Sequence, residues 1–533
     1  MPRIKLLYAL MIAGIAMCLA QIWWPHYYLT GDGPCHLYNA KVLHDMWHGT
    51  DVAFYSRFYV INYNPNPNWL SNILLGIPMY FTNGPVAEKL FLTLYAGLVV
   101  GGFYLLIKKV SGSSSYWITV IFLFVFHHTL AKGFYNFSFS TALWFWMVWS
   151  WMRFIDKKNT LNTLVFFLFA GLSFFTQLLP FVFAVATCFG LIVSYSLTRE
   201  QGLKQSSLNY FIQNTITLGI LTAPFVALMI RFTENEGGTH ITLHHHFYRL
   251  VELVQFKYGI NAVENESFLT ALCGMTLAAL LITAVVFRIK DKIAVNKYDG
   301  FFYSLIFILF IYLFFPENFM QRDILISMRA QLFILILAGI CIAYTLPQQI
   351  KNAGGLILFF CFAGLTMVRM NYMNKASDAA EDYNSVAAHI RPYSLVLPLD
   401  FAPEGKDRNN KTIADRNYLF THALHYAGCE KPLILLDNYE ANAGYFPLQW
   451  KYKVNPYAHL SKDNGIEGQP PGADIEAYVN VSHIPIDYIV TWCYDAKALQ
   501  NKRYSELDSQ MKRMYHEVYT SPSKRTVLYE RNK

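Results

Sequence analysis

Charged residues are scarce in this chain of 533 residues. They make up 15% of the sequence, whereas an ordinary soluble domain has about 25%, so a soluble enzyme is disfavoured. Cysteine is sparse as well, and eight residues do not suit a small disulfide-rich scaffold. A disordered chain is excluded because it would contain few aromatic residues, and here 17% are aromatic and 54% hydrophobic.

Long apolar runs recur along the first 370 residues. A membrane-spanning helix needs about 20 mostly apolar residues, and the hydropathy pattern predicts eleven such segments. The stretch 69–82 is apolar but short and contains Pro78, so we interpret it as re-entrant or interfacial, with a full span as the alternative. The predicted spans are 6–24, 86–107, 114–127, 134–152, 162–176, 179–197, 209–230, 268–287, 300–315, 329–346 and 353–370.

The distribution of positive charge predicts the orientation of these spans. The net charge is +8, and with a cytoplasmic N-terminus most of the basic excess falls in the cytoplasmic segments. Lysine and arginine favour that side, and an odd number of spans then places the tail 371–533 outside. The first run has no clear small-residue cleavage site before Trp24, so we expect an uncleaved anchor. The chain is thus predicted to be a multi-pass protein of the inner (plasma) membrane without a nucleic-acid partner.

Two domains follow from the change in composition near residue 370. The first, 1–370, is a transmembrane domain with outer loops 25–85 and 231–267. The second, 371–533, is an extracytoplasmic α/β domain. Within it no G-x-G-x-x-G or P-loop pattern occurs, so nothing indicates a nucleotide. Its predicted strands are 394–399, 432–436 and 487–492, and its predicted helices are 411–427 and 496–515.

The first outer loop is the most informative segment. Gly31-Asp32-Gly33-Pro34 is typical of a turn followed by a helix start. If the helix runs from Asp32, then Asp32, His36 and Asn39 share one face. Leu37, Ala40 and Trp47 fall on another face, which suits a helix lying on the membrane surface. In the alternative interpretation Asp32 is only a turn or capping residue.

Asp32-Gly33-Pro34-x-His36-Leu37-x-x-Ala40, directly after the first span, resembles the first outer loop of polytopic glycosyltransferases of the GT-C superfamily. These include oligosaccharyltransferases, protein mannosyltransferases and aminoarabinose transferases. Four further segments are similar to the bacterial branch: 64–70, 84–90, 133–137, and 316–318 with 327–329. The resemblance covers the layout of residues 1–370 and matches only short motifs.

The resemblance implies a GT-C-like fold and a sugar donor carried on a polyprenyl phosphate. It also implies that Asp32 is the general base that takes a proton from the acceptor hydroxyl, as suits inverting transfer. The acceptor would be a glycan, a lipid or a protein. Because loop 25–85 has no Asp-x-Asp or Glu-x-Asp pair, we assign no metal ligand and no certain cofactor. A divalent metal near Asp32, with His36 as a second ligand, stays open.

A lipid-phosphate donor also needs cations at the outer interface. Arg329 is the favoured candidate among Lys132, Arg231, Arg322 and Arg329, because snorkelling to lipid headgroups is the better explanation for Arg231 and Arg322. The residues expected to bind donor or acceptor are His36, Asn39, Lys132, Glu317 and Arg329. His244-His245-His246, with His240 nearby, is interpreted as a solvated loop face rather than a metal site.

The sequence therefore predicts a membrane glycosyltransferase of the cell envelope, transferring a hexosyl or pentosyl group. A transporter or flippase is the alternative from another class, but it would usually place charges inside the spans or show an internal repeat. Neither is evident here. A non-catalytic membrane assembly protein with the same layout also remains open.

Overall fold

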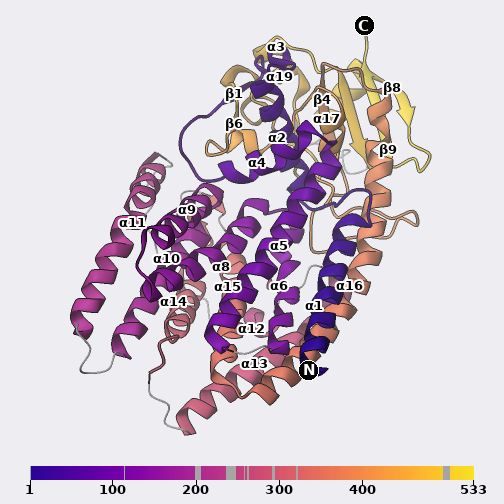
Figure 1. Cartoon of the computed structure of the whole chain (residues 1–533). Helices are drawn as coiled ribbons and strands as arrows, with labels where there is room; N and C mark the ends of the chain where they lie inside the picture. Colours follow the sequence, from indigo (N-terminus) through magenta and orange to yellow (C-terminus); the bar gives the residue numbers. More distant parts are fainter. Residues whose placement is uncertain are drawn as a thin grey trace.

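Helices dominate the protein and form a bundle that carries a smaller mixed α/β region at one end (Figure 1). The computed structural model describes residues 2–112, 115–198, 206–235, 248–256, 258–260, 263–290, 295–319, 322–323, 325–495 and 505–533. His240 and the triplet 244–246, which we interpreted as a solvated face, lie outside these residues.

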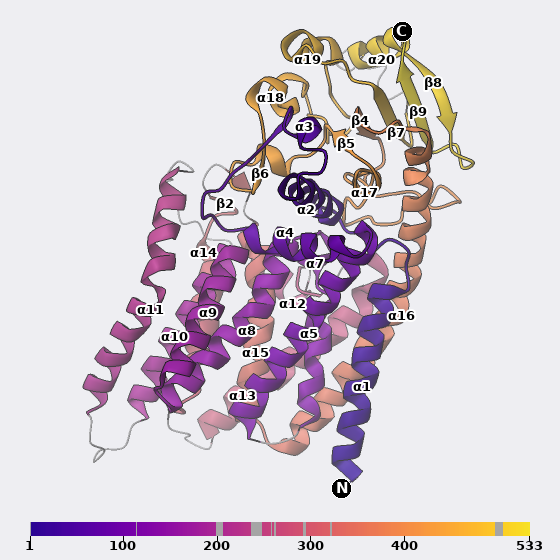
Figure 2. The ribbon, with the colours of Figure 1, turned by 45° about the horizontal axis from the view of Figure 1, so that its top comes forward.

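The bundle is built from helices that run back and forth between its two ends (Figure 2). Its long helices are α1 (Pro2–Trp23), α5 (Gly84–Ser111), α8 (Tyr135–Asp156), α9 (Thr160–Thr176), α10 (Leu178–Leu197), α11 (Ser207–Asn235), α13 (Ser267–Lys290), α14 (Gly300–Phe314), α15 (Ile326–Thr345) and α16 (Gln348–Asn384). Short helices and strands lie between them: η2 (Tyr116–Ile121), α6 (Phe122–Val125), α7 (His128–Ala131), α12 (Tyr248–Val254), η3 (Glu264–Glu266), β2 (Asn318–Phe319) and β3 (Arg322–Asp323).

Seven helices in the described part of the chain are long and apolar enough to cross a membrane. They begin at Lys5, Gly84, Leu178, Ser207, Ser267, Ile326 and Gln348. The other four predicted segments are also helical, but 116–131, 160–176 and 300–314 are shorter apolar helices. The mostly helical fold is therefore confirmed, with seven helices among the described residues that could cross a membrane by length and composition, while the count of eleven spans stays a prediction.

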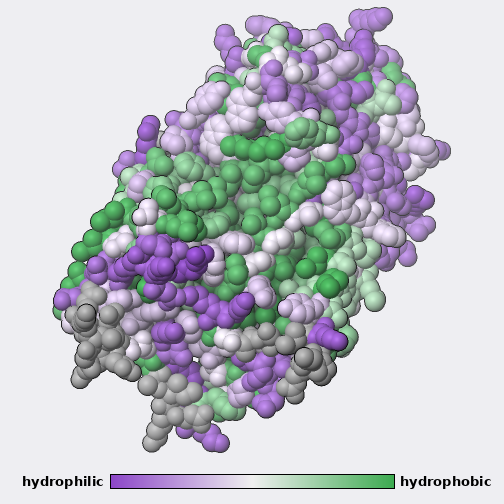
Figure 3. All heavy atoms as spheres, in the orientation of Figure 1, coloured by the Kyte–Doolittle hydropathy of each residue, from purple (hydrophilic) through white to green (hydrophobic). Residues whose placement is uncertain are grey.

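The surface of the bundle suits a lipid environment. α11 exposes Ile212, Ile216 and Ile220, which are spaced four residues apart and form one apolar stripe. On the face shown in Figure 3, hydrophobic residues form a band across the bundle, and hydrophilic residues gather over the α/β region and again toward the opposite end. An apolar belt next to a polar cap is the pattern of a protein embedded in a bilayer.

The N-terminus lies at the end of the bundle that is remote from the α/β region (Figures 1 and 2). Helices that run toward this end finish on basic residues: Lys108 and Lys109 in α5, Arg153 in α8, and Arg288 and Lys290 in α13. This segregation matches the charge distribution on which the predicted orientation rests. The orientation itself stays a prediction.

The first outer loop and the tail are interlocked. The loop contains α2 (Gly33–His48), α3 (Val52–Tyr55), β1 (Tyr59–Ile61), α4 (Trp69–Gly76) and η1 (Ile77–Tyr80). β1 pairs antiparallel with β6 (Leu448–Trp450) of the tail, so that Tyr59 faces Trp450. α2 packs against α4 and against α17 (His425–Glu430) of the tail. Figure 2 shows α4 lying between α2 and the bundle, which suits the interfacial interpretation of 69–82.

The tail contains a five-stranded sheet in the order β5-β4-β7-β9-β8. β4 pairs in parallel with both β5 and β7, and the two hairpin strands β8 and β9 extend the sheet antiparallel. The strands are β4 (Ser394–Asp400), β5 (Leu433–Leu435), β7 (Tyr488–Trp492), β8 (Tyr515–Thr520) and β9 (Thr526–Arg531). The remaining tail elements are η4 (Ser385–His389), η5 (Glu440–Asn442), η6 (Tyr452–Val454), α18 (Pro456–His459), α19 (Ile475–Ser482) and α20 (Ser505–Met514). The three strands predicted for the tail are confirmed.

Two details of the predicted elements differ from the structure. The helix predicted at 411–427 is a run of turns until His425, because its backbone bonds elsewhere: the N–H groups of Ile413 and Phe420 donate to the carbonyls of Gly405 and Pro403. The predicted apolar face of α2 is covered mostly by protein, and only Trp47 of its three residues is exposed. Leu37 and Ala40 are 0% and 1% exposed, since α4 and the tail cover them.

The boundary placed between 370 and 371 falls inside α16, which continues unbroken from the bundle to Asn384. Within this helix Ala379, Ala380 and Tyr383 are buried. The helix thus connects the bundle rigidly to the α/β region. Of the helix predicted at 496–515, α20 covers the second half, and 496–504 lie outside the described residues.

Candidate functional site

Asp32 lies in a turn that packs tightly against the segment joining α7 to α8. The backbone N–H groups of Gly31 and Asp32 donate to the carbonyls of Ala131 and Lys132 at 3.2 and 3.0 Å. Gly133 has a φ of +87°, and a Cβ atom there would lie 2.3 Å from the backbone nitrogen of Asp32. Only glycine accommodates both the conformation and the approach. The glycines thus hold Asp32 directly beside Lys132.

The side chain of Asp32 is partly exposed and makes no capping hydrogen bond to α2. Asp32 therefore occupies the N-cap position without capping the helix through its side chain, and the helix begins at Gly33 with Pro34 in its first turn, as predicted. The interpretation of Asp32 as a turn residue stays an alternative. Burial raises the pKa of Asp32 above its ordinary value, while His422, His36 and a hydrogen bond from Tyr439 oppose the rise. A raised pKa makes the carboxylate a stronger base near neutral pH.

His36 joins the first outer loop to the tail. Its Nδ1 lies 2.5 Å from Oε1 of Glu440, and both side chains are nearly inaccessible. Its ring stacks on Tyr135 with the centroids 5.7 Å apart. Burial by itself lowers the pKa of His36, but the Glu440 carboxylate and Asp32 together raise it above the ordinary value. His36 is therefore held as a cation-forming partner of a buried carboxylate.

Asn39, like His36, binds Glu440 of the tail. Its amide Nδ2 donates to Oε2 of Glu440 at 2.8 Å and to Oδ1 of Asn438 at 3.2 Å, and its Oδ1 accepts from Nδ2 of Asn438 at 2.7 Å. The residue is 2% exposed. With its polar atoms engaged inside the protein, Asn39 orients Glu440 rather than presenting a free group to a substrate.

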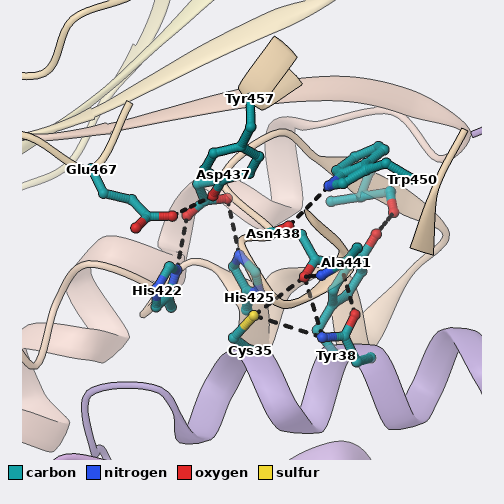
Figure 4. Close-up of polar contacts among 12 residues, drawn as sticks. Cys35, Tyr38, His422, His425, Asp437, Asn438, Ala441, Trp450, Tyr457 and Glu467 are labelled. Carbon is teal, nitrogen blue, oxygen red and sulfur yellow. Dashed lines mark hydrogen bonds and ion pairs between the residues drawn. The ribbon is translucent and has the colours of Figure 1, made fainter. Parts of the chain in front are cut away.

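A second buried group lies against α2, where Cys35 approaches two histidines of the tail (Figure 4). Nε2 of His425 lies 2.9 Å from Oδ1 of Asp437, and Nδ1 of His422 lies 3.5 Å from Oδ2 of the same carboxylate. The ligand atoms of Cys35, His422 and His425 lie within 4.8 Å of one another. In the described part of the chain, this trio could hold a metal ion; Asp32 and His36 do not form such a group.

The charges of this group depend on Asp437. Burial acts against ionisation of Asp437, but the two histidines lower its pKa to about 2. Burial acts against protonation of His422 too, but Asp437 and Glu467 raise its pKa to about 9. For His425 burial prevails and lowers the pKa.

Lys132 and Arg329 provide positive charge near Asp32. Lys132 lines a cavity of about 680 Å³, together with His128, Tyr258 and Met328. Burial lowers the pKa of Lys132, and the negative charge of Asp32 opposes this. Arg329 interacts electrostatically with Asp32 and lies over the rings of Phe134 and Phe137, with its Cζ atom 5.0 and 5.6 Å from the two centroids. Lys132, Gly133 and Phe134 are consecutive, so the segment that carries Lys132 also contacts Arg329 through Phe134.

Glu317 has partners of its own. Its Oε1 lies 2.8 Å from Nη2 of Arg249, and its Oε2 accepts from the backbone N–H of Ser327 at 3.2 Å. The carboxylate therefore holds the start of α15 in place. Arg329 lies three residues after the first residue of that helix. Of the residues predicted to bind donor or acceptor, the structure brings Lys132, Arg329 and His36 close to Asp32. Asn39 and Glu317 bind other residues, Glu440 and Ser327, instead of Asp32. Arg231 is exposed on α11.

Sequence reasoning missed the contribution of the tail. Asp437, Asn438, Tyr439 and Glu440 follow the predicted strand 432–436 without a break. Polar residues at the carboxyl end of a parallel strand are a frequent mark of a site in α/β domains. The sequence therefore contains a signal for these tail residues. It does not indicate that they pack against a loop 400 residues earlier.

No protein-family model matches this chain, and no curated protein sequence matches it. The resemblance to GT-C glycosyltransferases therefore rests on the sequence alone, on its short motifs and its layout of apolar segments.

Proposed function

We propose that this protein is a membrane glycosyltransferase. It would transfer a sugar from a polyprenyl-phosphate carrier to an acceptor hydroxyl at the outer face of the inner membrane. The observation that carries the proposal is the position of Asp32. It is a partly exposed carboxylate with a raised pKa, placed beside two cations and next to a large cavity at one end of the helical bundle.

The residues have distinct tasks in this proposal. Asp32 accepts the proton of the acceptor hydroxyl while that oxygen attacks the anomeric carbon of the donor. The bond from the anomeric carbon to the phosphate oxygen breaks, and the carrier phosphate leaves with the bonding electron pair. Lys132 and Arg329 offset the negative charge that develops on the leaving phosphate. A single displacement of this kind inverts the anomeric configuration.

The neighbours of Asp32 support a base rather than a structural aspartate. No capping hydrogen bond occupies its carboxylate. The Glu440 carboxylate holds His36 beside it, so a positive charge is available to orient the substrate or stabilise the ionised Asp32. The tail contributes Tyr439 and Glu440, which gives the α/β region a place in the site instead of a role as a detached appendage.

Substitution of Asp32 by asparagine tests the proposal. The change keeps the size of the side chain and removes its basicity, so we expect a loss of at least about 100-fold in transfer, as for removal of a general base. Surface glycans and glycolipids of a deletion strain would be compared after complementation with the wild-type chain or the variant. We expect the variant to lack the same modification as the deletion strain.

Asp51→Asn is the matched control. Asp51 belongs to the same outer loop, and its carboxylate accepts an exposed hydrogen bond from Tyr393 that an asparagine oxygen can also accept. We expect this variant to restore the modification fully. If Asp32→Asn restores it to the same level, Asp32 is not the base and the proposal fails.

A further inference from the structure

The buried group around Asp437 has the composition of a transition-metal site. Cys35 comes from α2 in the first outer loop, and His422 and His425 come from the tail. They are 0%, 3% and 0% exposed, and their ligand atoms lie within 4.8 Å of one another. Figure 4 shows Cys35 reaching up from α2 toward the two imidazoles.

Two buried ring nitrogens of this group make no hydrogen bond among the described residues, Nδ1 of His425 and Nδ1 of His422, and the second of them lies 3.5 Å from Oδ2 of Asp437. His425 directs Nε2 to Asp437 at 2.9 Å. Its Nδ1 is buried and has no hydrogen-bond partner among the described residues. A buried polar atom without a partner is rare in folded proteins. The thiol of Cys35 makes only long contacts: it donates to Oδ1 of Asn438 at 3.4 Å, and its Sγ accepts from Nδ2 of Asn39 at 3.8 Å. Nδ1 of His425 and the Cys35 thiol are therefore available to an ion.

Asp437 completes the arrangement. Its Oδ1 lies 2.9 Å from Nε2 of His425, and its Oδ2 lies 3.5 Å from Nδ1 of His422. Histidines that bind a metal usually donate their other ring N–H to a carboxylate, which fixes the tautomer and the ring orientation. With Asp437 on Nε2 of His425 and on Nδ1 of His422, the nitrogens left for a metal are Nδ1 of His425 and Nε2 of His422.

We propose that Cys35, His422 and His425 bind one Zn²⁺ ion, with Asp437 orienting both imidazoles. Thiolate and imidazole ligands suit zinc, whereas magnesium, calcium and manganese prefer oxygen ligands. In a tetrahedral zinc site the ligand atoms are about 3.5 Å apart, and the three ligand atoms here lie within 4.8 Å of one another, so they need to approach one another by up to about 1.3 Å. The three protein ligands leave a fourth position for water or another oxygen ligand.

The ion has a definite place in the architecture. It joins the start of α2 to the tail, and Cys35 is three residues after Asp32. The site thus fastens the turn that carries Asp32 to the α/β region, and Asn39 links it to the contact between His36 and Glu440. The proposal concerns metal binding alone and does not depend on the glycosyl-transfer proposal.

Metal analysis of the purified full-length chain in detergent tests the site. After incubation with zinc and removal of excess ion, we expect about one equivalent of zinc per wild-type chain. Cys35→Ala and His425→Ala should each reduce it to a small fraction. Cys429→Ala is the matched control, because Cys429 is also a buried thiol but does not belong to the trio. Wild-type protein without zinc, or equal zinc in the Cys35 and Cys429 variants, would overturn the proposal.

Two measurements guard against a variant that fails to fold. Asp437→Asn keeps all three ligands, and we expect zinc affinity to fall by about 10- to 100-fold, as for other carboxylates behind metal-bound histidines. Wild-type protein loaded with cobalt should show a thiolate-to-cobalt charge-transfer band. An unchanged affinity in the Asp437 variant, or cobalt-loaded wild type without that band, contradicts the assigned ligands.

Discussion

At the scale of single residues, Asp400 shows what burial costs a carboxyl group without a full set of partners. Its Oδ1 accepts from the backbone N–H of Ala402, but its Oδ2 has no hydrogen-bond partner among the described residues. The side chain is 6% exposed. Burial raises the pKa of Asp400 to about 8, and the backbone hydrogen bond only partly opposes this.

This pKa predicts a dependence of stability on pH. Above the ordinary aspartate pKa and below about 8, the folded chain holds a proton that the unfolded chain has released. Stability therefore falls as pH rises through this window. Asp400→Asn removes the titration, and since each tenfold change in proton affinity is worth about 1.4 kcal/mol, we expect a gain of more than about 1 kcal/mol at high pH.

The measurement is thermal unfolding of both chains in detergent at about pH 5 and about pH 9. The variant should gain melting temperature over the wild type at the higher pH and much less at the lower one. A difference that is the same at both pH values would show that Asp400 is ionised throughout in the folded protein.

Single residues could be predicted from sequence where the contact is local. Asp32 and His36 are four residues apart, and helical geometry alone places them together. Glu440, His422 and Asp437 could not be predicted as their neighbours. Their approach depends on how the tail folds over α2, which is a packing property of about 100 residues rather than a property of any short segment.

At the scale of elements, the turn before α2 and the segment before α8 act as one unit. Gly133 fits against the backbone of Asp32 with no room for a side chain. Gly133→Ala adds a Cβ atom 2.3 Å from a backbone nitrogen, so one segment must move. We expect this variant to lose more than about 2 kcal/mol of stability and to displace Asp32 from Lys132.

Gly49→Ala separates this close approach from backbone strain. Gly49 has a similar φ of +78°, but a Cβ atom there meets no other atom within 4 Å. It should cost only the left-handed strain, about 1–2 kcal/mol, and leave glycan transfer intact. Thermal unfolding and glycan profiles of both variants test this. Equal effects on transfer would mean that the contact between the two segments does not position Asp32.

The elements themselves were predictable to different degrees. The predicted apolar segments and the three tail strands agree with the structure because hydropathy and β-branched runs are local signals. The turns at 411–424 were mistaken for a helix, because residues such as Leu419 and Phe420 are buried for non-local reasons. Backbone bonds to 403–405 replace the helical ladder there.

At the scale of the whole molecule, the first outer loop and the tail make one outer assembly on a helical bundle. The β1–β6 pair, the contact between His36 and Glu440, and the proposed zinc site all join the same two segments. The sequence predicts the bundle and a separate tail domain, but it does not predict that the first outer loop and the tail pack together. The candidate site lies where the two meet, above the cavity lined by Lys132.

The central claim is that Asp32 acts as the base in transfer from a lipid-linked sugar. The most direct measurement is mass spectrometry of lipid extracts from cells that carry the Asp32→Asn chain in place of the wild type. Blocked transfer should leave the polyprenyl-phosphate sugar unused, so we predict that one such lipid accumulates while one surface modification disappears. If the lipid-linked sugars and the surface glycans both match those of wild-type cells, the claim is contradicted.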